Sequence, residues 1–172
     1  MNLSNELTGP PSRAQTQHLK TWVAADADRF ADLMTHFFGP DYRITQRTSA
    51  VVSACVETWP WLIHPFLQPL LDHVRQQDCP NALVRNTFRL LQFIEIPEAL
   101  HDLATQACYE CLERANEPVA NRVFAMTVLA TLIKNYPELG RELRLWLQDR
   151  VPFESVAFRS RARKLIRKLP PA

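Results

Sequence analysis

The chain has 172 residues, of which 47% are hydrophobic and 22% are charged, and its formal net charge is +2. These proportions are typical of globular proteins and exclude an intrinsically disordered chain, and a chain of this length can bury roughly 70% of its unfolded surface without a metal or a disulfide. Only three glycines stand against thirteen prolines, which argues against an all-β fold and against a glycine-rich phosphate-binding loop.

Along the chain, residues 1–11 are expected to be disordered or frayed, because Gly9, Pro10 and Pro11 interrupt regular structure. Apolar residues then recur at helical spacing, and prolines follow Trp59, Ile96 and Tyr136 at comparable places. The pattern predicts a single domain over residues 12–169. Its nine predicted helices span residues 14–25, 27–38, 41–58, 60–76, 81–95, 97–115, 117–135, 137–149 and 153–168.

A motif of the form Arg-x-x-Ala-x-x-x-apolar recurs along the chain, and an apolar β-branched residue stands three positions before each copy. Its copies read Arg47/Ala50/Ala54, Thr87/Leu90/Ile94 (degenerate), Arg122/Ala125/Leu129 and Arg159/Ala162/Ile166, preceded by Ile44, Val84, Val119 and Val156. The steps between copies are 40, 35 and 37 residues. That period is typical of stacked helical pairs.

The repeat resembles the HEAT/armadillo class of helical repeats over about residues 26–168. An acid five residues before the arginine also fits this class, as in Glu117 and Glu154, and Asp41 stands six residues before Arg47. The resemblance implies an all-α fold, a right-handed α-α superhelix or solenoid of about nine helices, in which acids and arginines form a ladder between repeats. Thr87 replaces an arginine, so the ladder should be broken there. The chain is also similar to small bacterial HEAT-repeat proteins with no assigned activity, a likeness that carries over no catalytic residues.

Four arginines near the starts of successive helices form the first candidate binding surface: Arg47, Arg85, Arg122 and Arg159. Stacking would place them in a row, and guanidinium groups bind phosphates or carboxylates bidentately. In the alternative interpretation each arginine pairs with an acid of its own or the adjacent repeat. The row is therefore either a binding surface or a structural ladder.

The last segment of the chain is strongly basic. From residue 150 onward seven Lys/Arg stand against Glu154, giving +6, while the preceding 149 residues carry 13 Lys/Arg against 17 Asp/Glu, giving −4. Arg163 lies on the polar side of the predicted last helix. That side could contact phosphates, or it could be the polar outer face of a terminal capping helix.

Trp59 and Trp61 flank the first proline turn. Exposed tryptophans are favoured anchors in binding sites, although these two could instead pack the turn against the core. Both interpretations stay open from the sequence.

The sequence indicates no catalytic, metal or cofactor site. Cys108 and Cys111 have a metal-site or redox spacing, yet they lie within a helical pattern without a second Cys/His pair. With Cys55 and Cys79 we interpret them as reduced core residues of a cytoplasmic protein. No apolar run approaches the roughly 20 residues of a membrane span, and no signal core is present, so we expect no membrane partner.

The sequence therefore favours a non-catalytic interaction module, a scaffold that binds a protein or peptide on the concave face of the predicted superhelix. The alternative is a nucleic-acid-binding protein that uses the arginine row and the basic C-terminal helix. HEAT-fold DNA glycosylases hold DNA, but the catalytic aspartate with tryptophans on which they depend has no match here. A third interpretation, an enzyme or chaperone of the bilin-lyase type, rests on fold analogy alone. The oligomeric state stays open.

Overall fold

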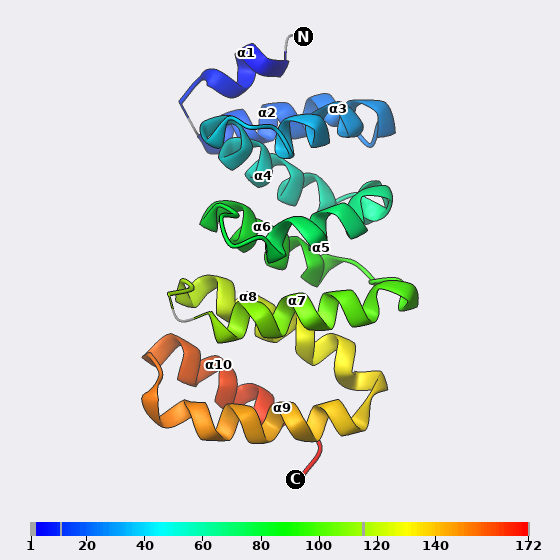
Figure 1. Cartoon of the computed structure of the whole chain (residues 1–172). Helices are drawn as coiled ribbons and strands as arrows, with labels where there is room; N and C mark the ends of the chain where they lie inside the picture. Colours follow the sequence, from blue (N-terminus) through cyan, green and yellow to red (C-terminus); the bar gives the residue numbers. More distant parts are fainter. Residues whose placement is uncertain (1–2, 11, 115, 172) are drawn as a thin grey trace. The chain divides into compact units, whose positions relative to one another are not determined.

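The computed structural model describes residues 3–10, 12–114 and 116–171. These residues form ten α-helices and five short 3-10 helices, with no strand among them, which confirms the expected all-α class (Figure 1). The chain divides into two compact units, residues 1–95 and residues 96–172. The single domain predicted over residues 12–169 stays a prediction.

The described residues of unit 1 (residues 1–95) form six α-helices and two 3-10 helices. They are α1 (Leu3–Thr8), α2 (Arg13–Val23), α3 (Ala27–Phe37), α4 (Tyr42–Val56), η1 (Pro60–Phe66), α5 (Leu67–Arg75), α6 (Asn81–Leu90) and η2 (Leu91–Phe93). Helix α4 is central, because it contacts α1, α2, α3 and α6. Its buried neighbours include the wholly covered rings of Phe30, Phe37 and Phe88.

Side-chain caps begin several helices of unit 1. The Asp26 carboxylate accepts the backbone N–H groups of Asp28 and Arg29 at the start of α3, and the Asp41 carboxylate accepts those of Arg43 and Ile44 at the start of α4. Such caps satisfy amide groups that have no partner inside the helix. Asp41, the acid that stands six residues before Arg47, is therefore the cap of α4.

Helix α1 corrects the expectation of a frayed N-terminus. Leu3 and Leu7 are buried, one helical turn apart, and α1 packs on α4. Gln15 of α2 adds a side-chain hydrogen bond to the backbone carbonyl of Glu6. Gly9 and Pro10 stand after the last residues of α1, but they do not prevent the residues before them from forming a helix.

The helix predicted over residues 60–76 is divided in two. Residues 60–66 form the 3-10 helix η1, with Pro65 inside it, and α5 follows. Proline has no N–H group and its ring crowds the preceding turn, so the tighter 3-10 winding gives way to α-helix only after Pro65.

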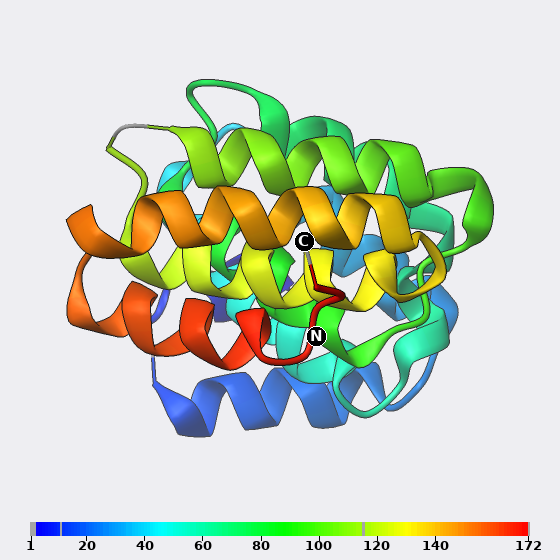
Figure 2. The same ribbon diagram turned by 90° about the horizontal axis from the view of Figure 1, so that it is seen from below.

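Within unit 2 (residues 96–172), the residues that the structure describes form four α-helices and three 3-10 helices. They are η3 (Glu98–Leu100), α7 (His101–Glu113), α8 (Val119–Leu132), η4 (Ile133–Asn135), α9 (Pro137–Arg150), η5 (Val151–Phe153) and α10 (Val156–Ile166). Helix α7 packs on α8, and α10 packs on both α8 and α9. Figure 2 shows α9 and α10 side by side.

The C-terminal segment is held against α9. Arg144 donates through Nη1 to the carbonyl oxygens of Ile166 and Leu169, at 2.6 and 3.0 Å, which satisfies free carbonyls at the end of α10. A Cβ at Gly140 would lie 2.9 Å from Cδ of Pro170. Glycine at this position therefore permits the close approach of the C-terminal segment.

Candidate functional site

The four arginines of the predicted row have different environments. Arg122 of α8 holds Glu154 through two hydrogen bonds, Nη1 to Oε2 at 2.9 Å and Nη2 to Oε1 at 2.5 Å. Its Nε donates to the carbonyl of Leu112 at 3.1 Å, and its guanidinium lies 4.5 Å from the ring centroid of Phe158. The Arg122 and Glu154 side chains are only 12% and 14% exposed. Arg122 is thus a structural residue, paired with the acid of the next repeat.

Arg47 occupies the same position of its repeat but has a different partner. Its Nη1 donates to the carbonyl of Leu7 at 2.6 Å, near the C-terminal end of α1. The next copy carries Ala82 where an acid would precede the motif, and Thr87 where its arginine would stand. Arg47 therefore stabilises the end of α1, where free carbonyls favour a cation.

A pocket of about 350 Å³ opens beside Arg47 in unit 1. Helices α1, α2, α4 and α6 contribute to its lining. It brings together two arginines of the predicted row, Arg47 and Arg85, and adds Arg43. None of the residues that line it is acidic. We call this pocket the arginine pocket.

Sequence reasoning missed Arg43 because it considered only one arginine in each repeat. Arg43 stands three residues before Gln46 and four before Arg47, Ala50 stands four and three residues after these two, and all four residues line the arginine pocket. That spacing puts side chains on one helical face. The signal was therefore present in the sequence.

A hydrogen-bonded pair of helices underlies the arginine pocket. The Asn86 Nδ2 group of α6 donates to Ser49 Oγ of α4 at 2.7 Å, and Ser49 Oγ donates to the carbonyl of Gln46, also at 2.7 Å. Both side chains are buried. This chain of hydrogen bonds fixes α4 against α6, the two helices that carry Arg43 and Arg85.

The other two basic candidates, Arg159 and Arg163, lie on α10. With Lys164 and Arg167 they line a shallow depression of about 400 Å³, and no acid is among its lining residues. The opposite side of α10 is apolar and covered, as at Ala162 and Leu165. The helix therefore has the polar outer face and buried inner face that the sequence predicted.

The two tryptophans differ in exposure. Trp59 is half-buried, and Lys20 Nζ lies 5.8 Å from the centroid of its ring. Trp61 is 54% exposed. Trp59 thus packs within unit 1, while Trp61 presents its ring to solvent.

The buried thiols of α7 are poorly placed to bind a metal or to act as nucleophiles. Cys108 and Cys111 are buried on α7; burial raises the pKa of Cys111 to about 12 and that of Cys108 well above its usual range. Within the described ranges, His, Cys, Asp and Glu side chains form no group of three or more that could hold a metal ion. Because metal ligands and nucleophiles need the thiolate, these cysteines remain neutral core residues.

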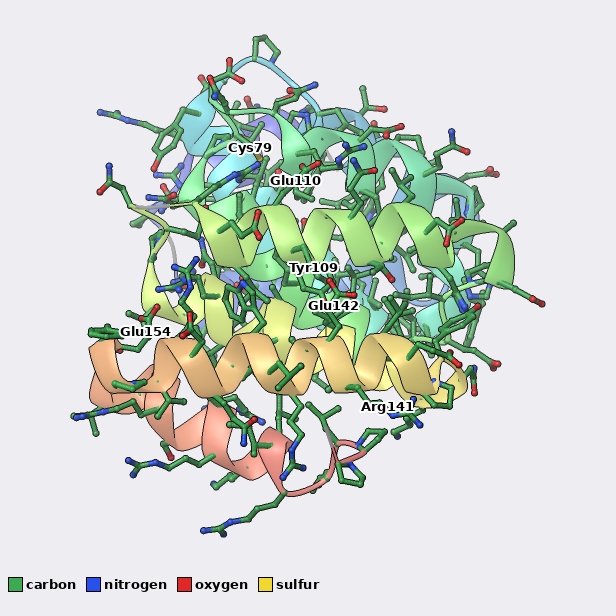
Figure 3. All side chains as sticks on the ribbon, turned by 60° about the horizontal axis from the view of Figure 1, so that its bottom comes forward. Cys79, Tyr109, Glu110, Arg141, Glu142 and Glu154 are labelled. Atoms are coloured by element: carbon green, nitrogen blue, oxygen red, sulfur yellow. The ribbon has the colours of Figure 1, made fainter. Side chains whose placement is uncertain are left out.

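Tyr109 of α7 is the other strongly shifted group. Burial, and then the charge of Glu142 on α9, raise the pKa of Tyr109 to about 12; Figure 3 shows the two residues between α7 and α9. The phenol oxygen is buried without a hydrogen-bond partner in the described part of the chain. A phenol with this pKa keeps its proton near neutral pH, so it cannot act there as a base.

A family model described as a HEAT repeat domain matches residues 3–169. Comparisons with curated proteins and with solved structures found no match to the chain. None of the helices in the described ranges is long and apolar enough to cross a membrane. The family match covers both units, agrees with the all-α class expected for a solenoid of helical repeats and with the arginine–acid contact between adjacent copies, and shows that the chain belongs to the HEAT repeat family.

Proposed function

We propose that the protein is a non-catalytic interaction module that binds a protein or a peptide through the arginine pocket. HEAT repeats often mediate protein interactions. The observation that carries the proposal is a pocket formed by four helices, with three arginines and no acid in its lining. Uncompensated positive charge on a packed framework is suited to bind an anionic partner without large rearrangement.

Two of the three arginines are accessible. Arg43 and Arg85 are exposed, and both project from helices that pack on each other. A partner could therefore contact them while α4 and α6 keep their positions. Arg47 is half-buried and already donates to Leu7, so its role is to shape the wall of the pocket.

Peptide display on the immobilised protein tests this function. We expect selected peptides to bind the wild-type chain and to lose affinity for the double variant Arg43→Gln/Arg85→Gln. Arg89→Gln is the matched control, because Arg89 lies on the same helix as Arg85 but pairs with Glu57. Selected peptides that bind the double variant as well as the wild type would contradict the pocket as the binding site.

A second candidate function, nucleic-acid binding, is supported by α10. Its outer face carries Arg159, Arg163, Lys164 and Arg167 without an acid among the lining residues, and lines of cations favour phosphate backbones. A mobility shift with mixed-sequence DNA and RNA at low and high salt tests it. Arg163→Gln/Arg167→Gln should lower the salt slope by about 2, whereas Arg141→Gln on α9 should not change it. Absence of binding even at low salt would remove this candidate.

A further inference from the structure

The arginine pocket offers a ligand polar and apolar surface in similar amounts. The apolar residues at its base, Leu7, Leu19 and Val51, are almost entirely covered by their neighbours. The exposed lining residues include Arg43, Gln46 and Arg85. A ligand that enters therefore meets exposed guanidinium and amide groups beside hydrocarbon, and the guanidinium groups favour a ligand that carries hydrogen-bond acceptors.

We propose that this pocket binds a carboxylate of an acidic peptide segment, with Arg43 and Arg85 as the two guanidinium partners. This inference rests on the proposed function and names the class of peptide. Arginine binds carboxylates with short charge-assisted hydrogen bonds in a planar geometry. Because Arg47 already donates to Leu7, two accessible guanidinium groups remain for the two oxygens of a carboxylate.

Charge complementarity identifies the occupant as acidic. The lining contains three arginines and no acid, so no carboxylate of the pocket itself compensates the exposed guanidinium groups. A basic or neutral peptide would leave these cations without compensation when it covered them, and burying an unpaired charge is costly. An acidic side chain removes that cost.

The size of the pocket indicates an extended segment rather than a folded surface. Its volume of about 350 Å³ equals the share of roughly a dozen water molecules in the liquid and lies at the small end of ligand pockets. Such a volume accommodates one or two side chains. A peptide would thus insert an Asp or Glu side chain while the rest of its backbone stayed outside.

Fluorescence anisotropy with three labelled peptides tests the inference: a glutamate-rich peptide, the same peptide with glutamine at every glutamate, and the same peptide with phosphoserine at those positions. We expect the glutamate peptide to bind at least about tenfold more tightly than the glutamine peptide, and less tightly as salt is raised. Arg43→Gln/Arg85→Gln should weaken its binding at least about tenfold, and Arg89→Gln should leave it unchanged.

The outcomes separate this inference from the function on which it rests. Equal binding of the glutamine peptide, tighter binding of the phosphoserine peptide, or an unchanged affinity in the double variant would each overturn the carboxylate assignment. If display instead selects peptides without acids whose binding still depends on Arg43 and Arg85, the carboxylate assignment fails while the interaction function stands. If no peptide of any composition depends on these arginines, both fail. Both side chains are exposed, so the double variant should keep the wild-type circular dichroism spectrum.

Discussion

Arg47 in unit 1 and Arg122 in unit 2 hold the same position of the repeat but stabilise the molecule in different ways. Arg122 is enclosed and bonded to Glu154, Leu112 and the Phe158 ring. Arg47 is half-buried and bonded to one backbone carbonyl, that of Leu7. An arginine at the same position of the repeat motif thus pairs with the acid of the next repeat in unit 2, whereas in unit 1 it stabilises the end of α1.

The difference follows from a single position of the next repeat. Glu154 precedes the copy that follows Arg122, whereas Ala82 stands at the corresponding place after Arg47. Without an acid there, the positive charge of Arg47 adds to those of Arg43 and Arg85 around one pocket. The departure from the repeat pattern therefore leaves the charge of Arg47 in the wall of the pocket, beside the exposed Arg43 and Arg85.

Thiol labelling would follow the two units separately and should show the largest effect. Cys55 reports on unit 1 and Cys111 on unit 2; burial raises the pKa of each from 9.0 to about 12. Raising the pKa by this amount lowers the thiolate population near pH 8 by about a thousandfold. We expect both thiols to resist a thiolate-specific reagent by at least that factor relative to the chain in denaturant, as measured by mass spectrometry of cysteine-containing peptides.

Because opening of a unit exposes its thiol, any residual labelling rate reports the opening of that unit. Arg122→Ala should accelerate the labelling of Cys111 much more than that of Cys55. Equal acceleration of both thiols would contradict a stabilising role of Arg122 that is specific to unit 2.

The enclosed ion pair gives the largest change in stability. Arg122→Ala leaves Glu154 and the Leu112 carbonyl without this partner, and breaking a largely buried pair costs about 3 kcal/mol. Urea unfolding of Arg122→Ala, Glu154→Ala and the double variant should give a coupling energy of about 1 kcal/mol or more. The exposed pair of Arg89 with Glu57, 46% and 30% exposed, is the control, for which we expect less than about 1 kcal/mol. Similar costs for the two pairs would contradict the importance of burial.

The sequence predicted the helices whose positions depend on residues close together in the chain. Apolar spacing and prolines located α8 within residues 117–135 and α10 within residues 153–168, because helical periodicity and helix ends are local properties. The sequence did not reveal α1, whose stability comes from burial of Leu3 and Leu7 against α4 and is not evident from its six residues.

The partners of the arginines were harder to predict than the helices. Arg122 and Glu154 are 32 residues apart, and Arg47 and Leu7 are 40 apart, so the choice between a ladder and a binding surface depends on tertiary packing. The sequence left both interpretations open; in the structure Arg122 pairs with Glu154, whereas Arg47 donates to Leu7 and lines a pocket. The spacing of Arg43 and Arg47 on α4 was available, but only the fold brings Arg85 of α6 to the same pocket.

Replacing Arg47 tests the role of the arginine in unit 1 and should lower the free energy of unfolding less than replacing Arg122 does. Arg47→Ala removes one hydrogen bond at the end of α1, which should cost about 1–2 kcal/mol. Hydrogen exchange should quicken in α1 and remain unchanged in α8. Arg47→Met retains much of the apolar stem, so a similar loss in this variant would assign the effect to the guanidinium. A loss as large as that of Arg122→Ala would contradict the distinction between the two arginines.

Replacing Thr87 should give the smallest change in stability, and it should raise the free energy of unfolding, whereas the arginine replacements lower it. Thr87 replaces the repeat arginine in α6, its side chain is wholly buried, and its Oγ1 lacks a hydrogen-bond partner in the described part of the chain. A buried hydroxyl without a partner loses its hydration and gains nothing in return. Thr87→Val keeps the branched shape and should raise the free energy of unfolding by about 1 kcal/mol, which urea denaturation can measure. Ser53→Ala removes from α4 a similar buried hydroxyl that also lacks a partner among the described residues, but it puts no atom in its place, so the small void left behind should reduce the gain. A loss of stability in Thr87→Val would contradict this prediction, because it would mean that the Thr87 hydroxyl makes a stabilising hydrogen bond.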